Sequence, residues 1–219
     1  MDPPRRGPQR GLSVERVVEA ALAIADSEGI EGLSMGAVAA RLETGPMTLY
    51  RYVPSKAVLT LLLADRAQLA PNRSDPTGQW RDDLRSWSRT FRDIYDAHPW
   101  LLDVPITGAP LLPNEVANLE VGLRAIAPAG LDAPQSLLVL RSLAAFVRNE
   151  AIQRRSLASG SLDMHAYAEA LTGLINEADH ATLCGILAGD ALRVDDLEDD
   201  FEPGIALLID GIDAGGRPA

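Results

Sequence analysis

The segment from Ser34 to Lys56 constrains the fold more than any other part of this chain, because it holds two helical patterns separated by a break. Ser34 is a favourable N-cap residue, and apolar residues follow it at helical spacing. The pattern stops at residues 43–45, and Pro46 then begins a second helix at a position where its missing N–H is not needed. This second helix, which should end near residue 52, is too short to be stable alone. The segment therefore predicts a helix-turn-helix, a motif that presents its second helix to the major groove of DNA.

The side chains of this segment suit contacts with DNA. Thr48, Tyr50 and Tyr52 offer hydroxyl groups to phosphates or base edges, whereas Met47 suits the methyl group of thymine. Lys56 lies at the start of the next helix, where an ammonium group and free N–H groups suit a phosphate. The predicted DNA-binding residues are Ser34, Pro46, Met47, Thr48, Tyr50, Arg51, Tyr52 and Lys56.

The run Thr-Leu-Tyr-Arg-Tyr-Val-Pro-Ser-Lys at 48–56 resembles the recognition helix of the tetracycline-repressor (TetR) family. The helix before it also fits, and the resemblance extends from Leu12 to Ala67. A second stretch, residues 80–155, resembles the C-terminal domain of tetracycline-repressor-like proteins. The resemblance implies a homodimeric repressor that binds a double-stranded DNA operator and holds an inducer in its C-terminal domain. Gly36 departs from the family's pattern, because a longer or charged side chain there often helps to read DNA.

The remaining sequence predicts an all-α protein, because no run alternates apolar and polar residues with β-branched enrichment. The expected architecture is an N-terminal three-helix helix-turn-helix bundle joined to a larger helical domain for ligand binding and dimerisation. Residues 71–78 are rich in helix-breaking residues and mark the boundary. We therefore expect a disordered arm at 1–11, a DNA-binding domain at 12–70, a linker at 71–78 and the C-terminal domain at 79–219.

Helical spacing also predicts the individual elements. Ser13 and Ser55 should cap the first helix and the fourth, and the fourth should end near Leu69. Further helices are expected from Trp80, at 115–126, from Ala133 or Pro134 to about 155, at 162–175, at 181–187 and from Phe201. We assign the long helix and the last helix to a dimer interface, because a short recognition helix reads only a few base pairs. Packing within one subunit is the alternative for both.

Charge is distributed unevenly along the chain, whose net charge is −11. Residues 1–70 contain eight basic and eight acidic side chains, so the remainder carries the whole excess of acid. DNA would repel that remainder, so the asymmetry favours a protein with one DNA-facing end.

Aromatic and polar residues of the C-terminal part are candidates for a ligand site, because helical bundles often hold apolar pockets with a few polar anchors. The candidates for a small apolar or aromatic effector are Trp87, Phe91, Tyr95, His98, Trp100, Phe146 and Asn149. Simple core packing is the alternative for each aromatic residue. Three scattered histidines and a single cysteine predict neither a metal site nor a cofactor.

Motifs of several other protein classes are absent from the sequence. No Gly-x-Ser-x-Gly elbow, phosphate-binding loop or His-Glu-x-x-His motif occurs, so we do not expect an enzyme. No apolar run is long enough to cross a membrane, and we expect a soluble, cytoplasmic protein. The sequence predicts a ligand-released repressor. The alternative is a DNA-binding regulator whose C-terminal domain only dimerises or binds a protein partner.

Overall fold

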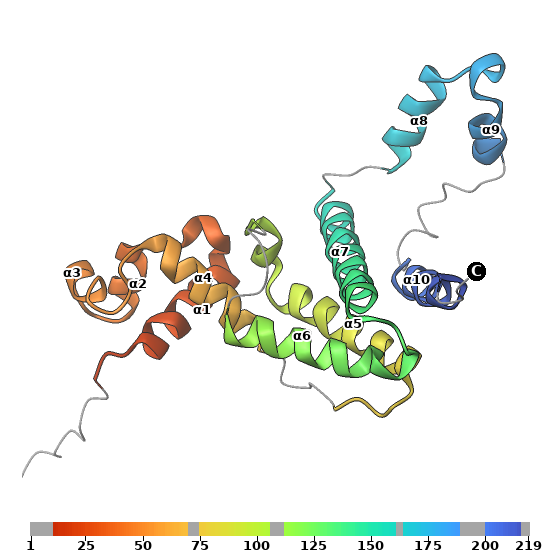
Figure 1. Ribbon diagram of the computed structural model, residues 1–219. Helices are drawn as coiled ribbons and strands as arrows, with labels where there is room; N and C mark the ends of the chain where they lie inside the picture. Colours follow the sequence, from red (N-terminus) through yellow and green to blue (C-terminus); the bar gives the residue numbers. More distant parts are fainter. Residues whose placement is uncertain (1–10, 70–74, 106–111, 161–163, 189–199, 216–219) are drawn as a thin grey trace, which may run out of the picture. The chain divides into compact units, whose positions relative to one another are not determined.

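The computed structural model describes residues 11–69, 75–105, 112–160, 164–188 and 200–215. Helices make up the regular structure of these residues, and none of them forms a strand, which confirms the all-α prediction. The chain, whose helices are labelled in order in Figure 1, divides into two compact units. The first comprises residues 1–70 and 97–116, and the second comprises residues 71–96 and 117–219. Residues 1–10 of the expected disordered arm at 1–11 lie outside the described residues.

The first unit is built on four helices near the N-terminus. They are α1 (Val14–Gly32), α2 (Met35–Arg41), α3 (Pro46–Leu49) and α4 (Lys56–Ala67). Three serines accept the first free backbone N–H groups of helices, as expected: Ser13 at α1, Ser34 at α2 and Ser55 at α4. Helix α1 packs against both α2 and α4 around a core of fully buried residues, which includes Val17, Ala21, Leu33, Val38, Leu49, Val53, Leu59 and Leu63.

The first unit also contains a segment that lies after α5 in the sequence. The short 3₁₀ helix η1 (Pro99–Asp103) packs against α1. Asp26 of α1 holds it in place, because its Oδ1 lies 2.7 Å from His98 Nδ1 and accepts a 2.7 Å hydrogen bond from Trp100 Nε1. The expected division placed these residues in the C-terminal domain. Their position differs because the contacts that hold them join residues more than 70 positions apart.

A second carboxylate of the first unit anchors the start of α6 (Pro113–Ile126). Leu112 precedes this helix and has no side-chain acceptor for its first N–H groups. Asp65 of α4, which is 9% exposed, supplies one. Its Oδ1 accepts from the backbone N–H groups of Asn114 at 2.8 Å and Glu115 at 3.3 Å, and its Oδ2 accepts from Asn114 Nδ2 at 3.0 Å. A residue of α4 therefore caps α6.

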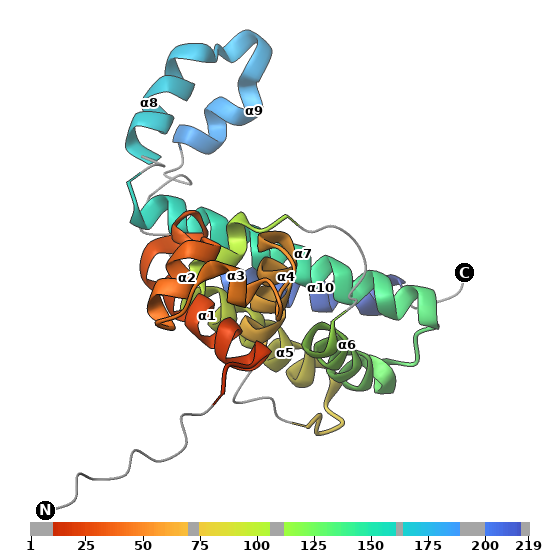
Figure 2. The same cartoon turned by 90° about the vertical axis from the view of Figure 1, so that its left-hand side faces the viewer.

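The second unit gathers its core from four helices. These are α5 (Trp80–Ala97), the later turns of α6, α7 (Ala133–Ala158) and α10 (Phe201–Gly215). Their shared core consists of Leu84, Trp87, Ala125, Ile126, Leu140, Leu143, Val147, Phe201, Ile205 and Ile209. The 3₁₀ helix η2 (Ala127–Ala129) follows α6, and residues 130–132 connect it to α7. Asp132 and Gln135 form a capping box at the start of α7. Helices α7 and α10 lie side by side (Figure 2).

Two further helices of the second unit, α8 (Met164–Leu174) and α9 (Glu177–Ala188), form a hairpin in both views (Figures 1 and 2). No described side chain of α9 is buried. Tyr167, Leu174 and Ile186 are among the exposed apolar side chains of this hairpin. The hairpin therefore contributes little to the core of the unit.

The bonds from Asp65 predict a local effect on the first turn of α6. In an Asp65→Ala variant, the amides of Asn114 and Glu115 lose their acceptor, so their hydrogen exchange should accelerate. The free energy of unfolding should fall by about 1–2 kcal/mol, the usual cost of a lost N-cap. Hydrogen-exchange mass spectrometry of peptides that cover the start of α6 measures the first effect. Glu120→Ala, on the exposed face of the same helix, is the control and should leave that exchange unchanged. Equal exchange in wild type and Asp65→Ala would contradict the capping role.

Candidate functional site

The turn between α2 and α3 fixes the geometry of the candidate DNA-binding surface. Glu43 adopts a left-handed backbone with φ of 52°, and the Thr44 N–H donates to the Ala39 carbonyl at 3.0 Å. Gly45 precedes Pro46, which occupies the first turn of α3 as expected. Leu49, the last residue of α3, is fully buried, whereas Pro46 and Met47 are exposed and Thr48 is half-buried. The chain thus forms the predicted helix-turn-helix.

Helix α3 is shorter than the sequence suggested. Its α-helical part ends at Leu49, whereas the expected end was near Tyr52. Hydrogen-bonded turns continue the helical path after Leu49, because the N–H groups of Tyr52 and Val53 both donate to the Leu49 carbonyl, at 2.8 and 2.9 Å. These turns end at the buried Val53, three residues before the start of α4.

Most of the predicted DNA-binding residues lie on α3 and the turns that follow it, whereas Ser34 caps α2 and Lys56 begins α4. Met47 is 79% exposed, Tyr50 45% and Tyr52 39%, which is unusual for large apolar or aromatic side chains. Ser34, Pro46, Arg51 and Lys56 are also exposed, and Thr48 is half-buried. The guanidinium of Arg51 and the ammonium of Lys56 form no hydrogen bond or ion pair with the described residues, so both charges remain available to an anion. The surface combines hydroxyl groups, an apolar tip and two cations.

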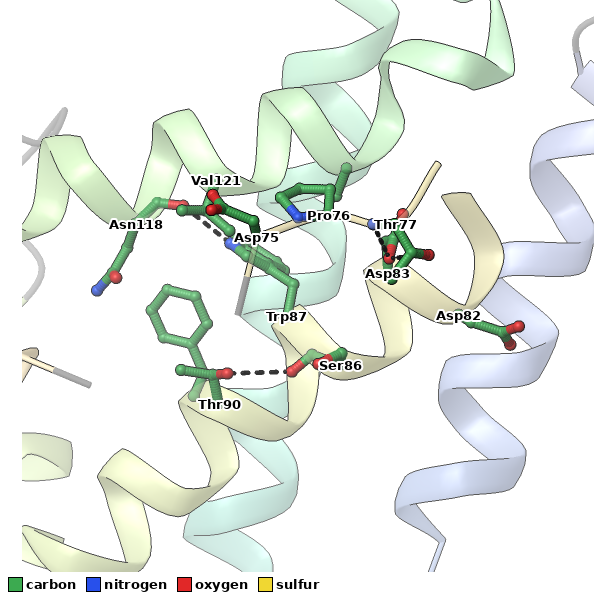
Figure 3. Close-up of a pocket in the computed structure, with 12 residues that line it drawn as sticks. Asp75, Pro76, Thr77, Asp82, Asp83, Ser86, Trp87, Thr90, Asn118 and Val121 are labelled. Carbon is green, nitrogen blue, oxygen red and sulfur yellow. Dashed lines mark hydrogen bonds between the residues drawn. The ribbon is translucent and has the colours of Figure 1, made fainter. Parts of the chain in front are cut away.

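The second unit contains a pocket of about 260 Å³ between α5, α6 and the segment that precedes α5 (Figure 3). Trp87 and Phe91, two of the candidate ligand residues, line it. Their rings meet edge to face with centroids 4.7 Å apart. The other lining residues are Asp75, Pro76, Thr77, Asp82, Asp83, Ser86, Thr90, Asn118, Val121 and Ala125. Its volume lies just below the ~300–1,000 Å³ of typical ligand pockets, so it suits a compact molecule.

Trp87 is fixed against α6 on two sides. Its indole N–H donates to the Asn118 carbonyl at 2.9 Å (Figure 3). A Cβ atom at Gly122, one helical turn later, would lie 2.9 Å from the indole ring and 3.0 Å from Leu140. The absence of a side chain at residue 122 therefore lets the indole approach the backbone of α6.

A buried carboxylate forms the polar side of the pocket. Asp83 is 8% exposed, and its Oδ1 accepts from both the N–H and the hydroxyl of Thr77 at 2.9 Å. Its Oδ2 accepts from the Gly78 N–H, also at 2.9 Å. Burial raises the pKa of Asp83, but the bonds from Thr77 and Gly78 lower it by more, so the pKa lies below its ordinary value. The group therefore carries a negative charge at neutral pH.

The other candidate ligand residues lie outside this pocket. Tyr95 and Phe146 pack, partly buried, against the core of the second unit, and Asn149 is exposed on α7. His98 and Trp100 belong to the first unit, where both contact Asp26. Sequence reasoning missed Asp83 and Asn118 above all. The role of Asp83 depends on how residues 77 and 78 fold back onto its carboxylate, and that of Asn118 depends on the packing of α5 against α6.

The described residues contain neither a candidate metal site nor a helix that could span a membrane. No group of three or more His, Cys, Asp or Glu side chains lies in an arrangement that would hold a metal ion there. None of the helices in that part of the chain is long and apolar enough to cross a membrane.

Comparisons with known protein families match most of the chain. Residues 17–63 match the family described as bacterial regulatory proteins, tetR family. Residues 71–215 match the family described as tetracyclin repressor-like, C-terminal domain. The chain belongs to the TetR family.

Individual TetR relatives agree with this assignment. The transcriptional repressor DrrR1 of Streptomyces coeruleorubidus is 47% identical over 134 residues, which are 60% of this chain and 50% of that protein. The match thus spans half of that relative's length. The class E tetracycline repressor of Escherichia coli is 28% identical over 171 residues, which are 76% of this chain and 79% of that protein. The solved structure of ActR of Streptomyces coelicolor, in complex with actinorhodin, has a TM-score of 0.81 and 28% identity, and the match covers 96% of this chain and all of ActR.

The close approach of Trp87 to α6 makes residue 122 sensitive to any side chain. In Gly122→Ala, the new Cβ displaces the fixed indole, and overpacking of this kind costs about 1–3 kcal/mol of stability. Gly185→Ala, in α9, is the matched control, because no atom lies within 4 Å of its Cβ. It should gain up to about 1 kcal/mol through helix propensity. Urea denaturation of both variants tests the contrast, and a Gly122→Ala protein as stable as wild type would contradict it.

The lowered pKa of Asp83 predicts how the contribution of this residue to the stability of the fold depends on pH. Because the pKa is lower in the folded protein than in the unfolded chain, ionised Asp83 stabilises the fold above the ordinary aspartate range. That contribution is lost as the pH falls through the folded value. Asp83→Asn should therefore lose about 1–3 kcal/mol of stability near neutral pH. The difference from wild type should shrink on acidification, when measured by denaturant unfolding across the acid range. A difference that stays constant with pH would show that the charge is not involved.

Proposed function

We propose that this TetR-family protein is a dimeric transcription repressor that binds a palindromic DNA operator and is released by a small molecule bound in the second unit. The exposed turn of α3, with Met47 and the unpaired Arg51 and Lys56 of the described chain, carries the DNA-binding part of the proposal. Exposure of the large apolar side chain of Met47 to water is unfavourable, whereas contact with a thymine methyl group in the major groove would bury it.

Each candidate residue has a distinct part in the proposed complex. Thr48, Tyr50 and Tyr52 would donate hydroxyl hydrogen bonds to phosphates or base edges. Pro46 positions this turn in the groove, and Ser34 at the start of α2 would contact a phosphate. Arg51 and Lys56 supply the cations that displace counterions from DNA. Few cations are available, so selective binding would depend on base contacts.

We expect dimerisation because the surface around α3 that would contact DNA is small. One turn of helix contacts only a few base pairs, so two copies must bind one duplex to achieve selectivity. Helices α7 and α10 are the proposed interface. They pack together within the subunit, and they also carry exposed leucines, namely Leu137, Leu138, Leu207 and Leu208. Symmetric pairing of these helices would cover that apolar surface.

The pocket is the proposed effector site, and α6 is the proposed element through which it acts. This helix begins in the first unit, where Asp65 of α4 caps it, and continues into the second, where Trp87 is bonded to it. A ligand that packed against Trp87 and shifted its ring would bias the position of α6, and the bonds of α6 to Asp65 would transmit that bias to α4. Operator release needs only about 1–3 kcal/mol of such coupling. Support for a ligand-responsive mechanism comes from ActR, which has been solved both without ligand and in complex with actinorhodin.

Fluorescence anisotropy tests the proposal directly. Purified protein is titrated onto labelled DNA from upstream of its own gene and onto a scrambled duplex at fixed, near-physiological salt. We expect selective binding with two protomers per site, and release by at least one molecule that binds the second unit. Equal, weak binding to both duplexes would contradict operator recognition at this promoter.

Lys56 provides a sharper prediction in the same assay. If its ammonium contacts a phosphate, Lys56→Ala should weaken binding to the operator and to unrelated DNA by the same factor. The slope of log affinity against log salt should fall in magnitude by about one. Arg66→Ala is the control on the same helix, because Arg66 is paired with Glu19 at 2.7 Å and should leave the slope unchanged. A loss confined to the operator sequence would show that Lys56 reads bases instead.

A further inference from the structure

The pocket in the second unit has a charge pattern that the proposed function does not require. Three of its lining residues are carboxylates, namely Asp75, Asp82 and Asp83, and no Lys, Arg or His is among the described residues that line it. Its remaining walls are aromatic or neutral. A site for an uncharged molecule would need no carboxylate, and Asp83, the buried one of the three, costs desolvation.

The two carboxylates at the rim are already paired. Arg124 Nη1 lies 3.0 Å from Asp75 Oδ1, and Arg85 Nη1 lies 2.9 Å from Asp82 Oδ1. Both aspartates are largely exposed, at 85% and 74% of their side chains, so water screens these pairs strongly. Each pair is neutral overall, but the carboxylates line the pocket and the arginines are not among its described lining residues, so the side of each pair that faces the pocket is the negative one.

The buried carboxylate differs, because no Lys, Arg or His of the described residues is paired with it. Asp83 accepts its three bonds from the uncharged donors of Thr77 and Gly78. A carboxylate has about four acceptor positions, so Oδ2 retains one. A negative charge that is held in place and shielded from water produces a strong local potential, since the effective dielectric constant is lower there than in solvent.

The aromatic wall favours the same kind of ligand. Trp87 and Phe91 meet edge to face, which leaves ring surface for a planar molecule to pack against. Ring faces also attract cations through their quadrupole. The indole N–H of Trp87 is committed to the Asn118 carbonyl, so this side chain cannot donate a hydrogen bond to a ligand and offers it only apolar contact.

We infer that this pocket selects a compact aromatic molecule that carries a cationic amine, with its ring against Trp87 and Phe91 and its ammonium group towards Asp83. This inference rests on the proposed function only in that the pocket is taken as the effector site. The negative charges and the aromatic wall act together, so a neutral or anionic molecule with the same ring binds less tightly.

A matched series of three indoles tests the charge preference. Tryptamine, tryptophol and indolepropionate share the ring and the length of the side chain, but they carry an ammonium, a hydroxyl and a carboxylate group. Isothermal titration calorimetry on the full-length protein at low salt should rank them in that order. Tryptamine should bind at least about tenfold more tightly than indolepropionate, as expected for one to two charge contacts of modest strength. Equal affinities, or no detectable binding of tryptamine at millimolar concentration, would overturn the inference.

Substitutions then locate the preference. The double variant Asp75→Asn/Asp82→Asn removes two charges of the rim and leaves the buried Asp83 unchanged. It should reduce the preference for tryptamine over tryptophol by about fivefold. The control is Asp93→Asn/Glu120→Gln, which removes two exposed charges from the same helices, α5 and α6, outside the pocket. An equal loss in both double variants would overturn the inference, because it would reflect net charge alone. Asp83→Asn, examined where it remains folded, should abolish most of the remaining preference.

Operator release, measured in parallel, separates this inference from the proposed function. Tryptamine that binds with the expected selectivity but leaves the operator complex intact would support the pocket inference and count against release by this ligand. Release by all three indoles at equal concentrations would support the proposed function and overturn the charge preference.

Discussion

The carboxylate of Asp65 is the contact on which the arrangement of the first unit depends. A helix that begins at Pro113 after a leucine has free N–H groups and no local acceptor for them. Asp65 satisfies two of these groups from α4 and also binds the side chain of Asn114. The positive end of the α6 dipole favours the charge, and the buried setting strengthens it. Two helices far apart in the sequence therefore share one set of hydrogen bonds, and the start of α6 belongs to the same compact unit as the helix-turn-helix.

Local chemistry was enough to predict most of the helices. Serine caps, a proline at the first turn and apolar spacing are properties of a few neighbouring residues, and Ser13, Ser34 and Ser55 cap helices as predicted. The end of α3 was harder to place, because a helix and a series of tight turns differ there by single hydrogen bonds to Leu49. The assignment of residues 97–116 could not be predicted, since Asp26 and Asp65 reach across roughly 50 to 75 positions in the chain.

The candidate ligand site shows the same limit. The amphipathic pattern of α5 identified Trp87 and Phe91, because aromatic residues at helical spacing must pack against something. The pattern could not separate them from Tyr95 and Phe146, which pack against the core instead of lining the pocket. The amphipathic pattern gave no indication of the polar side of the pocket. Asp83 lies on the same helix as other acids, and only the fold shows that Thr77 and Gly78 surround its carboxylate.

The contact between Trp87 and Gly122 also limits how such a protein can change. The indole occupies the volume that a methyl group at residue 122 would need, and its N–H is held by the carbonyl of Asn118. A larger residue at 122 becomes tolerable only after the ring has gone, and loss of the ring leaves a void beside a glycine. Neither substitution is easily accepted first, so the two positions should be inherited as a pair. New ligand preferences would then arise more readily from the rim, where Asp75 and Asp82 are exposed and can be exchanged one at a time.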